Sequence, residues 1–324
     1  MNTEHSTLQL VELLRQRLRA SIIGRDSVID LIIVAMLSDG HVLLEDYPGS
    51  GKTTLAKALG ASISEHPNSS VAPMRRVQFT PDLLPSDITG TTIFDPESRV
   101  FQFRPGPVFA NVVLADEINR TSPKVQAALL EAMGEKQVTI DNVTYPLGEV
   151  FFVIATQNPL DLAGTYPLPT AQLDRFLFKI RMTHIAPEHE LELLQNLDQY
   201  RQAECTLPQV SISELLTARE HVRSEVHVSE PIKQCLVSFA QRTRESNLTL
   251  QGLSTRALVL AIDALKATAF LNGRSFVSAE DVQSIAISLF GHRLMLAPGA
   301  PASDDVVREC LNGPLEELTR GMLR

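Results

Sequence analysis

The stretch His41-Val-Leu-Leu-Glu-Asp-Tyr-Pro-Gly-Ser-Gly-Lys-Thr53 decides the fold. Residues 41 to 45 form a short apolar run, which predicts a buried strand, and a helical pattern follows Thr53. A glycine-bearing turn between a strand and a helix directs backbone N–H groups towards phosphate oxygens at the helix N-terminus. Lys52 can reach the outer phosphates, and the Thr53 hydroxyl can hold Mg²⁺. The stretch therefore predicts a phosphate-binding loop.

The glycines of this loop have one departure from the usual spacing. Gly49 and Gly51 allow a tight backbone approach, but Asp46 stands where the pattern has its first glycine. Asp tolerates unusual backbone angles better than most residues, so the turn can survive. The alternative interpretation is a glycine turn before an ordinary helix, and the strand and helix around the loop argue against it.

Further apolar runs predict a parallel sheet. Strands are expected at residues 76 to 80, 111 to 115, 151 to 156 and 178 to 182. Helical stretches such as residues 123 to 133 separate them, and residues 8 to 18 and 26 to 37 predict two helices before the loop. Strands that alternate with helices indicate an α/β fold with helices on both faces of the sheet.

Two segments interrupt this alternation of strands and helices, and it ends altogether in the C-terminal part of the chain. Residues 81 to 107 hold five prolines and have the character of an insertion. Residues 137 to 146 alternate around Asp141-Asn142, which predicts a hairpin. After His184 the patterns are all helical, so we expect an α/β domain over residues 1–186 and an α-helical domain over residues 187–324.

Two carboxylates end the apolar run Val112-Val-Leu-Ala-Asp-Glu117. A parallel strand delivers them to the carboxyl edge of the sheet, beside the phosphate loop. Asp116 can hold the Mg²⁺ shell, and Glu117 can accept a proton from an attacking water. An acidic pair at a strand end can also be a solvated cap, but the two motifs together indicate ATP hydrolysis.

Other polar residues have weaker signals. Asn158, which closes the next strand, could orient the water or contact the terminal phosphate, or it could be a turn residue before Pro159. Arg175 and Arg256 could neutralise charge on a transferring phosphoryl group, in cis or in trans. The alternative for either arginine is a surface salt bridge.

Composition bounds the function. The chain has 324 residues and a net charge of -9, which argues against steering towards nucleic acid. Its three cysteines lack a CxxC pattern, and no apolar stretch reaches the length of a membrane span. The histidines have no zinc-ligand spacing. We expect a soluble cytoplasmic protein.

The chain resembles the MoxR-type AAA+ ATPases over nearly its whole length. The segments that carry the resemblance are residues 41–53, 77–90, 103–109, Asp116-Glu-Ile-Asn-Arg120, 128–133, Thr156-Gln-Asn-Pro159, Gln172-Leu-Asp-Arg-Phe176, Arg256, Gly273-Arg274 and His292-Arg293. The resemblance implies an AAA+ P-loop core with a parallel sheet flanked by helices, followed by a smaller all-α lid domain. Residues 81–107 would be the insert in its second helix, and residues 137–146 the hairpin before the sensor strand.

The resemblance also implies roles for individual residues. The catalytic residues would be Lys52, Glu117, Asn158 as the first sensor, Arg175 as the arginine finger and Arg256 as the second sensor. The Mg²⁺ ion would be held by Thr53 and Asp116. ATP would be bound by residues of the N-terminal segment and of the loop: Ile22, Ile23, Gly24, Tyr47, Pro48, Gly49, Ser50, Gly51, Lys52, Thr53 and Thr54. Arg120 could also act across a subunit interface, and an acidic residue at the place of Asp46 is common in this family.

Family members typically form hexameric rings, often with a partner that carries a von Willebrand factor A domain, and act in chaperone-like maturation or metal-cofactor insertion of a client protein. The main hypothesis is therefore an ATP-hydrolysing remodelling factor. The alternatives are a chelatase-type ATPase subunit, a regulatory nucleotide switch with little hydrolysis, and a nucleic-acid motor.

Overall fold

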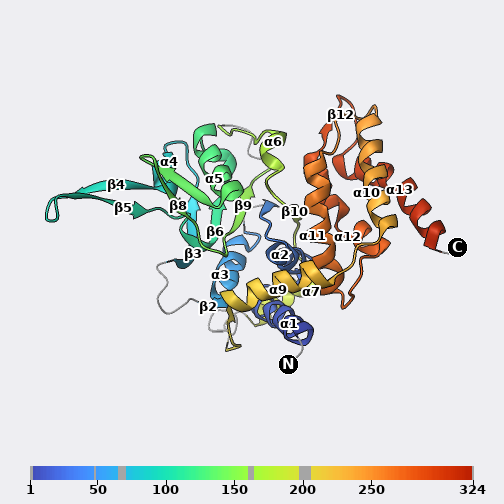
Figure 1. Cartoon of the computed structure of the whole chain (residues 1–324), viewed down its shortest axis with the longest axis horizontal. Coiled ribbons are helices and arrows are strands. Elements are labelled where there is room, and N and C mark those ends of the chain that lie inside the picture. The colour runs from blue at the N-terminus through green and yellow to red at the C-terminus, as the bar shows by residue number, and fades with distance from the viewer. Residues whose placement is uncertain (1–2, 47–48, 65–70, 160–163, 197–205, 323–324) are drawn as a thin grey trace.

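The computed structural model describes all residues except 1–2, 47–48, 65–70, 160–163, 197–205 and 323–324 (Figure 1). Its centre is a parallel five-stranded sheet in the order β10-β1-β9-β6-β3. The strands are β1 (Val42–Asp46), β3 (Ala72–Gln78), β6 (Ala110–Asp116), β9 (Phe152–Gln157) and β10 (Phe178–Met182). The predicted parallel sheet is confirmed, and the strand order brings the carboxyl ends of β1, β9, β6 and β3 to one edge.

Helices cover both faces of this sheet. Alternate residues of a strand point to opposite faces, so Leu44 and Leu114 pack into one core and Leu43 and Val113 into another. The covering helices are α1 (Thr3–Ser21), α2 (Asp26–Leu37) and α3 (Lys52–Ser62) in the first core, and α5 (Pro123–Glu135) in the second. Burial on both faces explains why the strands read as continuous apolar runs.

Two hairpins interrupt the alternation. After the short helix α4 (Pro85–Thr89), strands β4 (Gly90–Asp95) and β5 (Val100–Pro105) form an antiparallel ribbon that extends away from the body (Figure 1). The second hairpin is the one predicted over residues 137–146, and it is confirmed. It consists of β7 (Gln137–Ile140) and β8 (Val143–Pro146), with φ of 51° and 63° at Asp141 and Asn142. The rings of Phe103 and Tyr145 stack at a centroid distance of 3.9 Å and so join the two hairpins.

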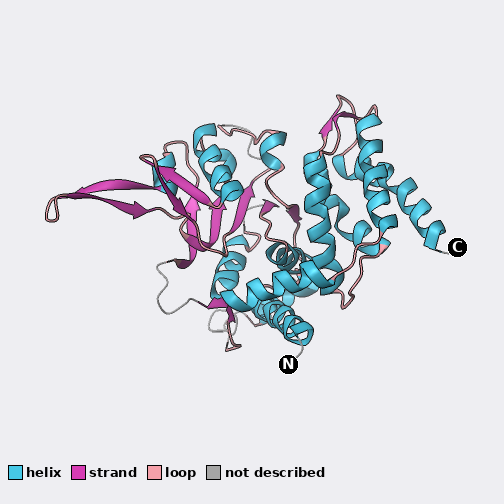
Figure 2. Cartoon of the chain, viewed as in Figure 1, coloured by secondary structure: helices cyan, strands magenta, loops and turns pink. Residues whose placement is uncertain are grey.

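The C-terminal part is mainly helical (Figure 2). Its helices are α7 (Pro187–Gln195), α9 (Ile212–Glu225), α10 (Glu230–Glu245), α11 (Thr255–Leu271), α12 (Ala279–Phe290) and α13 (Ser303–Met322). The expected smaller helical part is present, and it also contains short strands. These are β11 (Val210–Ser211), which pairs with β2 (Ile63–Ser64), and the pair β12 (Thr249–Gln251) and β13 (Met295–Leu296). Strands of two or three residues are too short to show a period in the sequence.

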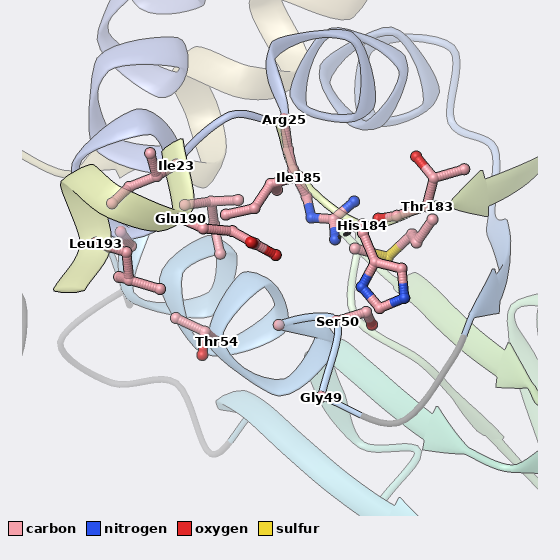
Figure 3. A pocket seen from close by; sticks show the side chains of 14 residues that line it. Ile23, Arg25, Gly49, Ser50, Thr54, Thr183, His184, Ile185, Glu190 and Leu193 are labelled. Carbon is pink, nitrogen blue, oxygen red and sulfur yellow. Dashed lines mark hydrogen bonds between the residues drawn. The ribbon is translucent and has the colours of Figure 1, made fainter. Parts of the chain in front are cut away.

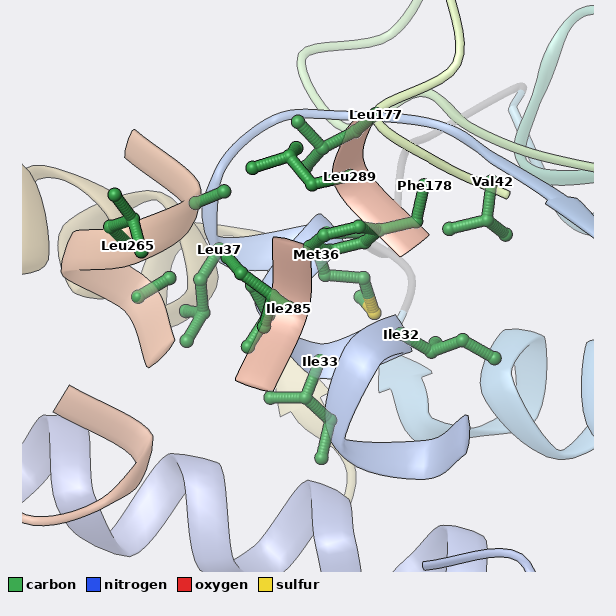
Figure 4. Packing of buried hydrophobic residues seen from close by; sticks show 14 of the residues in the cluster. Ile32, Ile33, Met36, Leu37, Val42, Leu177, Phe178, Leu265, Ile285 and Leu289 are labelled. Atoms are coloured by element: carbon green, nitrogen blue, oxygen red, sulfur yellow. The ribbon is translucent and has the colours of Figure 1, made fainter. Parts of the chain in front are cut away.

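One apolar core joins the C-terminal helices to the N-terminal ones. Leu265 of α11 and Ile285 of α12 belong to the same buried cluster as Met36 and Leu37 of α2 (Figure 4). The domain boundary near residue 186 stays a prediction, and the residues on its two sides share this core.

The chain's cysteines behave as apolar packing residues where they are described. Cys235 and Cys310 are free thiols and buried, and burial raises the pKa of Cys235 to about 11. Cys205 lies outside the described residues. No helix of the described ranges is long and apolar enough to cross a bilayer.

Candidate active site

The phosphate loop connects β1 to the first turn of α3. Gly49 and Gly51 have φ of 86° and 90°, a left-handed backbone that side-chain-bearing residues rarely adopt. A Cβ at either glycine would meet nothing within 4 Å, so the backbone angle and not crowding requires glycine here. Tyr47 and Pro48, also predicted to bind the nucleotide, lie outside the described residues.

Asp116 ends β6 directly beside the loop. Its Oδ1 lies 3.3 Å from Lys52 Nζ and accepts a hydrogen bond of 2.8 Å from the Thr156 hydroxyl. Its Oδ2 accepts a hydrogen bond of 2.7 Å from Arg76 Nη2. Burial of Asp116 raises the pKa of its carboxyl, but the hydrogen bonds from Arg76 and Thr156 and the charge of Lys52 outweigh this, and the pKa lies below its usual range. The side chain is therefore an anion at neutral pH.

The residues present fit a magnesium ion. Thr53 lies in the first turn of α3, and Asp116 lies next to Lys52 at the same end of the sheet. A hydroxyl and an ionised carboxylate are oxygen donors, which Mg²⁺ prefers, and nucleotide-bound Mg²⁺ needs only one or two protein oxygens beside the phosphates.

Glu117 is held in an unusual conformation one residue past the strand. Its φ and ψ are 59° and 50°, in the left-handed region, and such strain in a non-glycine residue is common at functional sites. Its Oε2 accepts a hydrogen bond of 2.8 Å from Gln78 Nε2 and lies 3.1 Å from Arg120 Nε. The backbone N–H of Glu117 donates to the Thr156 hydroxyl at 2.9 Å. These contacts fix a carboxylate at the carboxyl edge of the sheet.

The predicted first sensor, Asn158, lies at the same edge. It is the first residue after β9, which pairs with β1 on one side and with β6 on the other. Parallel strands place their carboxyl ends together, so Asn158 follows the strand that separates the loop from Asp116. The sheet therefore brings Lys52, Asp116, Glu117 and Asn158 to one edge.

A cavity of about 410 Å³ opens beside the loop (Figure 3). The predicted residues Ile22, Ile23, Gly49, Ser50, Gly51 and Thr54 line it. Gly24 lies against α7: its φ is 66°, and a Cβ built on it would lie 2.5 Å from Cδ2 of His189. The cavity adjoins the phosphate loop, and its lining combines apolar side chains with a few polar ones, so it suits the base and ribose of a nucleotide.

Sequence analysis missed several residues of this site. The cavity is completed by side chains from the end of β10 and from α7, among them Met182, His184, Ile185, Glu190 and Leu193. The side chain of Glu190 points into the cavity, and the ring of His184 lies near Ser50 (Figure 3). Arg76, Gln78 and Thr156 around the two carboxylates were also missed. Arg76 and Gln78 are polar residues on a predicted strand, which can indicate that they serve a site. That inference requires the knowledge that this strand lies beside β6, which carries Asp116.

The two predicted arginines are linked through Asp174, which precedes Arg175 in the chain and faces Arg256. Arg175 Nη1 donates to the carbonyl of Leu130 in α5 at 2.7 Å. Arg256, which is 59% exposed, has its Nε 3.9 Å from Asp174 Oδ2. The described lining of the cavity contains neither arginine. Arg120, the other candidate for an intersubunit role, pairs with Glu117 of its own chain.

Comparison with known proteins agrees with this geometry. Residues 41–178 match the family described as the ATPase family associated with various cellular activities (AAA), and residues 241–310 match the AAA lid domain. The uncharacterized protein YeaC of Bacillus subtilis is 42% identical over 93% of this chain and 93% of its own length. Chaperone MoxR1 of Mycobacterium tuberculosis is 40% identical over 87% of this chain and 75% of its own.

A solved structure extends the similarity to three dimensions. The fold superposes on that of a protein of Cytophaga hutchinsonii named provisionally as an ATPase. The TM-score is 0.85 and the sequence identity is 34%, over 96% of each chain. With the AAA and lid matches and the identity to MoxR1 over most of both lengths, the chain belongs to the MoxR family of AAA+ ATPases.

Proposed function

We propose that this chain hydrolyses ATP at the edge of the sheet where Lys52, Asp116 and Glu117 meet. The base and ribose would occupy the cavity beside the loop, and the loop N–H groups and Lys52 would bind the phosphates. Mg²⁺ held by Thr53 and Asp116 would neutralise charge on the phosphate oxygens. Glu117 would accept the proton of the attacking water, and Asn158 would orient that water.

One observation carries this proposal. Glu117 is fixed by Gln78 and Arg120 one residue past Asp116, whose carboxylate lies 3.3 Å from Lys52 Nζ. A solvated acidic cap needs neither the left-handed backbone of Glu117 nor the buried anion of Asp116. Both features have a reason if the first carboxylate binds a metal ion and the second acts on water.

The variant Glu117→Gln tests the proposal. It keeps the size of the side chain but removes the proton acceptor, so kcat should fall by about 10²–10⁴-fold. ATP affinity, measured by calorimetry, should change little, because the loop and the cavity are intact. Glu131→Gln, at an exposed position of α5, is the matched control and should hydrolyse as the wild type does. Equal turnover of Glu117→Gln and the wild type would exclude Glu117 as the base.

The site is further proposed to be shared between subunits of a ring, which by resemblance is a hexamer. What supports this is the position of Arg175 and Arg256, which adjoin one another through Asp174 and do not line the chain's own cavity. Each would complete the site of a neighbouring subunit. Light scattering in the presence of ATP should then give the mass of an oligomer, and a monomer with full hydrolytic activity would contradict the shared site.

The work done with the ATP is proposed to be chaperone-like: maturation or remodelling of a client protein, or insertion of its metal cofactor. What supports this is the name of the relative MoxR1, a chaperone. A partner with a von Willebrand factor A domain and a cytoplasmic location are part of the same proposal. A pull-down with the Glu117→Gln chain in ATP should retain the partner and the client, whereas DNA-stimulated hydrolysis would point to a nucleic-acid motor.

A further inference from the structure

The dipeptide His292-Arg293 lies buried where the C-terminal helices meet the sheet domain. It belongs to a short 3-10 turn (Gly291–Arg293) at the end of α12. The Arg293 side chain is 2% exposed, and its guanidinium reaches across to the segment that precedes β10. His292 Nε2 lies 3.0 Å from the carbonyl oxygen of Phe176 in that same segment.

The guanidinium of Arg293 is almost fully used by this contact. Its Nε donates to Asp174 Oδ1 at 2.8 Å, and its Nη2 donates to the carbonyl of Phe176 at 2.7 Å. Its Nη1 donates to the carbonyls of Leu177, at 3.0 Å, and Leu289. A planar fork of five donors fits such a set of fixed acceptors, and the single ammonium group of lysine cannot reproduce it.

Burial of this cation has an energetic cost, which the partners offset in part. Burial lowers the pKa of Arg293 to about 10, and the charge of Asp174 opposes that shift. Arg293 thus stays charged at neutral pH, and removal of Asp174 would leave it buried without a counter-ion. The apolar packing of α12 on β10 does not need a charge at this position, so the charge points to another requirement.

The segment that Arg293 holds carries the two proposed intersubunit arginines. Asp174 offers Oδ1 to Arg293 and its other oxygen, Oδ2, to Arg256 at 3.9 Å. Arg175 is the next residue, and its guanidinium is directed to the C-terminal half of α5 by the hydrogen bond to Leu130. Arg293 therefore fixes the backbone on one side of Arg175 and the counter-ion of Arg256.

We propose that Arg293 is a positioning residue for Arg175 and Arg256, and that through Asp174 it couples the position of the C-terminal helices to the arginines offered to the neighbouring subunit. The inference rests on the proposed function, in which these arginines act in trans. The Arg293 side chain is not part of the described lining of the nucleotide cavity. Its effect on the neighbour's hydrolysis is exerted through Asp174 and through the carbonyls of Phe176 and Leu177.

The first measurement compares Arg293→Lys with the wild type. The lysine keeps the charge but loses the fork, so Asp174 and Arg175 should lose their fixed geometry. A displacement of about 1 Å in a catalytic group can cost about 10²-fold in rate, so kcat should fall by about 10- to 100-fold. The KM for ATP should stay near the wild-type value, because the chain's own cavity and loop are unchanged.

Arg274→Lys is the matched control. Arg274 likewise pairs with an aspartate, here the buried Asp281, through two hydrogen bonds of 2.6 Å, but this pair lies wholly within the C-terminal helices. If Arg293 acted only through the stability of those helices, the two variants would lose activity in proportion to their loss of melting temperature. We expect Arg274→Lys to melt earlier and to hydrolyse at close to the wild-type rate.

The deciding experiment mixes subunits. Arg293→Lys keeps its own Glu117, and Glu117→Gln keeps all its arginines. In a mixed ring an Arg293→Lys site can therefore receive intact arginines from a Glu117→Gln neighbour, and the mixture should hydrolyse ATP faster than either chain alone. A mixture of Arg293→Lys with Arg175→Ala, two chains with the same defect, should show no recovery.

The outcomes separate the inference from the proposed function. If Arg175→Ala recovers activity with Glu117→Gln but Arg293→Lys does not, the shared site stands and the role of Arg293 is overturned. If neither mixture recovers, the shared site itself fails and the inference fails with it. Wild-type turnover of Arg293→Lys alone would also overturn the inference. If Arg293→Lys does not fold, Arg293→Gln, which is uncharged and needs no buried counter-ion, takes its place in the mixture with Glu117→Gln and decides the same question.

Discussion

At the scale of single residues, the site depends on side chains that hold the two carboxylates. Thr156 joins them, because its hydroxyl donates to Asp116 Oδ1 and accepts from the backbone N–H of Glu117. Gln78 and Arg120 hold the carboxylate of Glu117 from its sides. A general base works only when it is aimed at the proton it takes, so these contacts set the geometry of the proposed reaction.

Gln78→Leu isolates one of these contacts. It removes the 2.8 Å hydrogen bond to Glu117 and leaves the ion pair with Arg120. The carboxylate should then sample several orientations, and kcat should fall by about tenfold, the equivalent of a loss of about 1.4 kcal/mol of transition-state stabilisation. ATP affinity should stay unchanged, and steady-state hydrolysis with calorimetric ATP binding measures both.

Gln102→Leu is the control for that substitution. Gln102 also donates to a carboxylate, Asp95 Oδ2 at 3.0 Å, but on the extended β4–β5 hairpin. Its loss should leave kcat as it is. Equal turnover of Gln78→Leu and Gln102→Leu would mean that the hydrogen bond from Gln78 does not orient the base.

At the scale of elements, the turn between α1 and α2 and the helix α7 form two walls of the nucleotide cavity. Ile22 and Ile23 come from the first wall, and Glu190 and Leu193 come from the second. The turn contacts α7 at Gly24, because a Cβ on this residue would lie 2.5 Å from His189 Cδ2. The shape of the cavity thus depends on a close approach that glycine permits.

Gly24→Ala should push α7 away from the turn. The collision comes in addition to a strain of about 1–2 kcal/mol for a left-handed alanine. The cavity would widen, and we expect ATP to bind at least about tenfold more weakly, a loss of about 1.4 kcal/mol. Titration of the purified variant with a fluorescent ATP analogue measures this.

Gly273→Ala separates the collision from the strain. Gly273 has a φ of 72°, close to the 66° of Gly24, but a Cβ there would meet nothing within 4 Å. It should lower the melting temperature through the same backbone strain and leave ATP affinity intact. If both variants lost affinity equally, the contact of Gly24 with α7 would not shape the cavity.

The elements also show how far sequence could predict this protein. The strands around residues 42–46, 110–116 and 152–157 are continuous apolar runs that end in polar residues, so the edge with Asp116, Glu117 and Asn158 was predictable. The position of β3 beside β6 was not, because strand order is a matter of tertiary packing, and Gln78 was missed for that reason. Strand β4 was missed because Gly90–Asp95 packs on no sheet face, and its sequence lacks the usual apolar alternation.

At the scale of the whole molecule, the C-terminal helices and the N-terminal helices are one packing unit. Leu265 and Ile285 share a buried cluster with Met36 and Leu37 of α2, which itself lies against the sheet (Figure 4). Arg219 of α9 adds a polar link, since it donates to the carbonyl of Met36 at 2.7 Å. Movement of the C-terminal helices would therefore displace the helices that cover the sheet.

Leu265→Ala tests this shared core. Leu265 is 1% exposed, and truncation of a fully buried leucine to alanine costs about 2–5 kcal/mol of unfolding free energy. The void left by the removed side chain would border α2. Amide hydrogen exchange should therefore become faster in a peptide covering Asp26–Leu37 as well as in α11. The control is Leu250→Ala, a leucine that is 65% exposed and whose loss should cost less than about 0.5 kcal/mol. Faster exchange in α11 with unchanged protection of α2 would show that the two parts open independently, and the coupling assigned to Arg293 would then depend on its polar contacts alone.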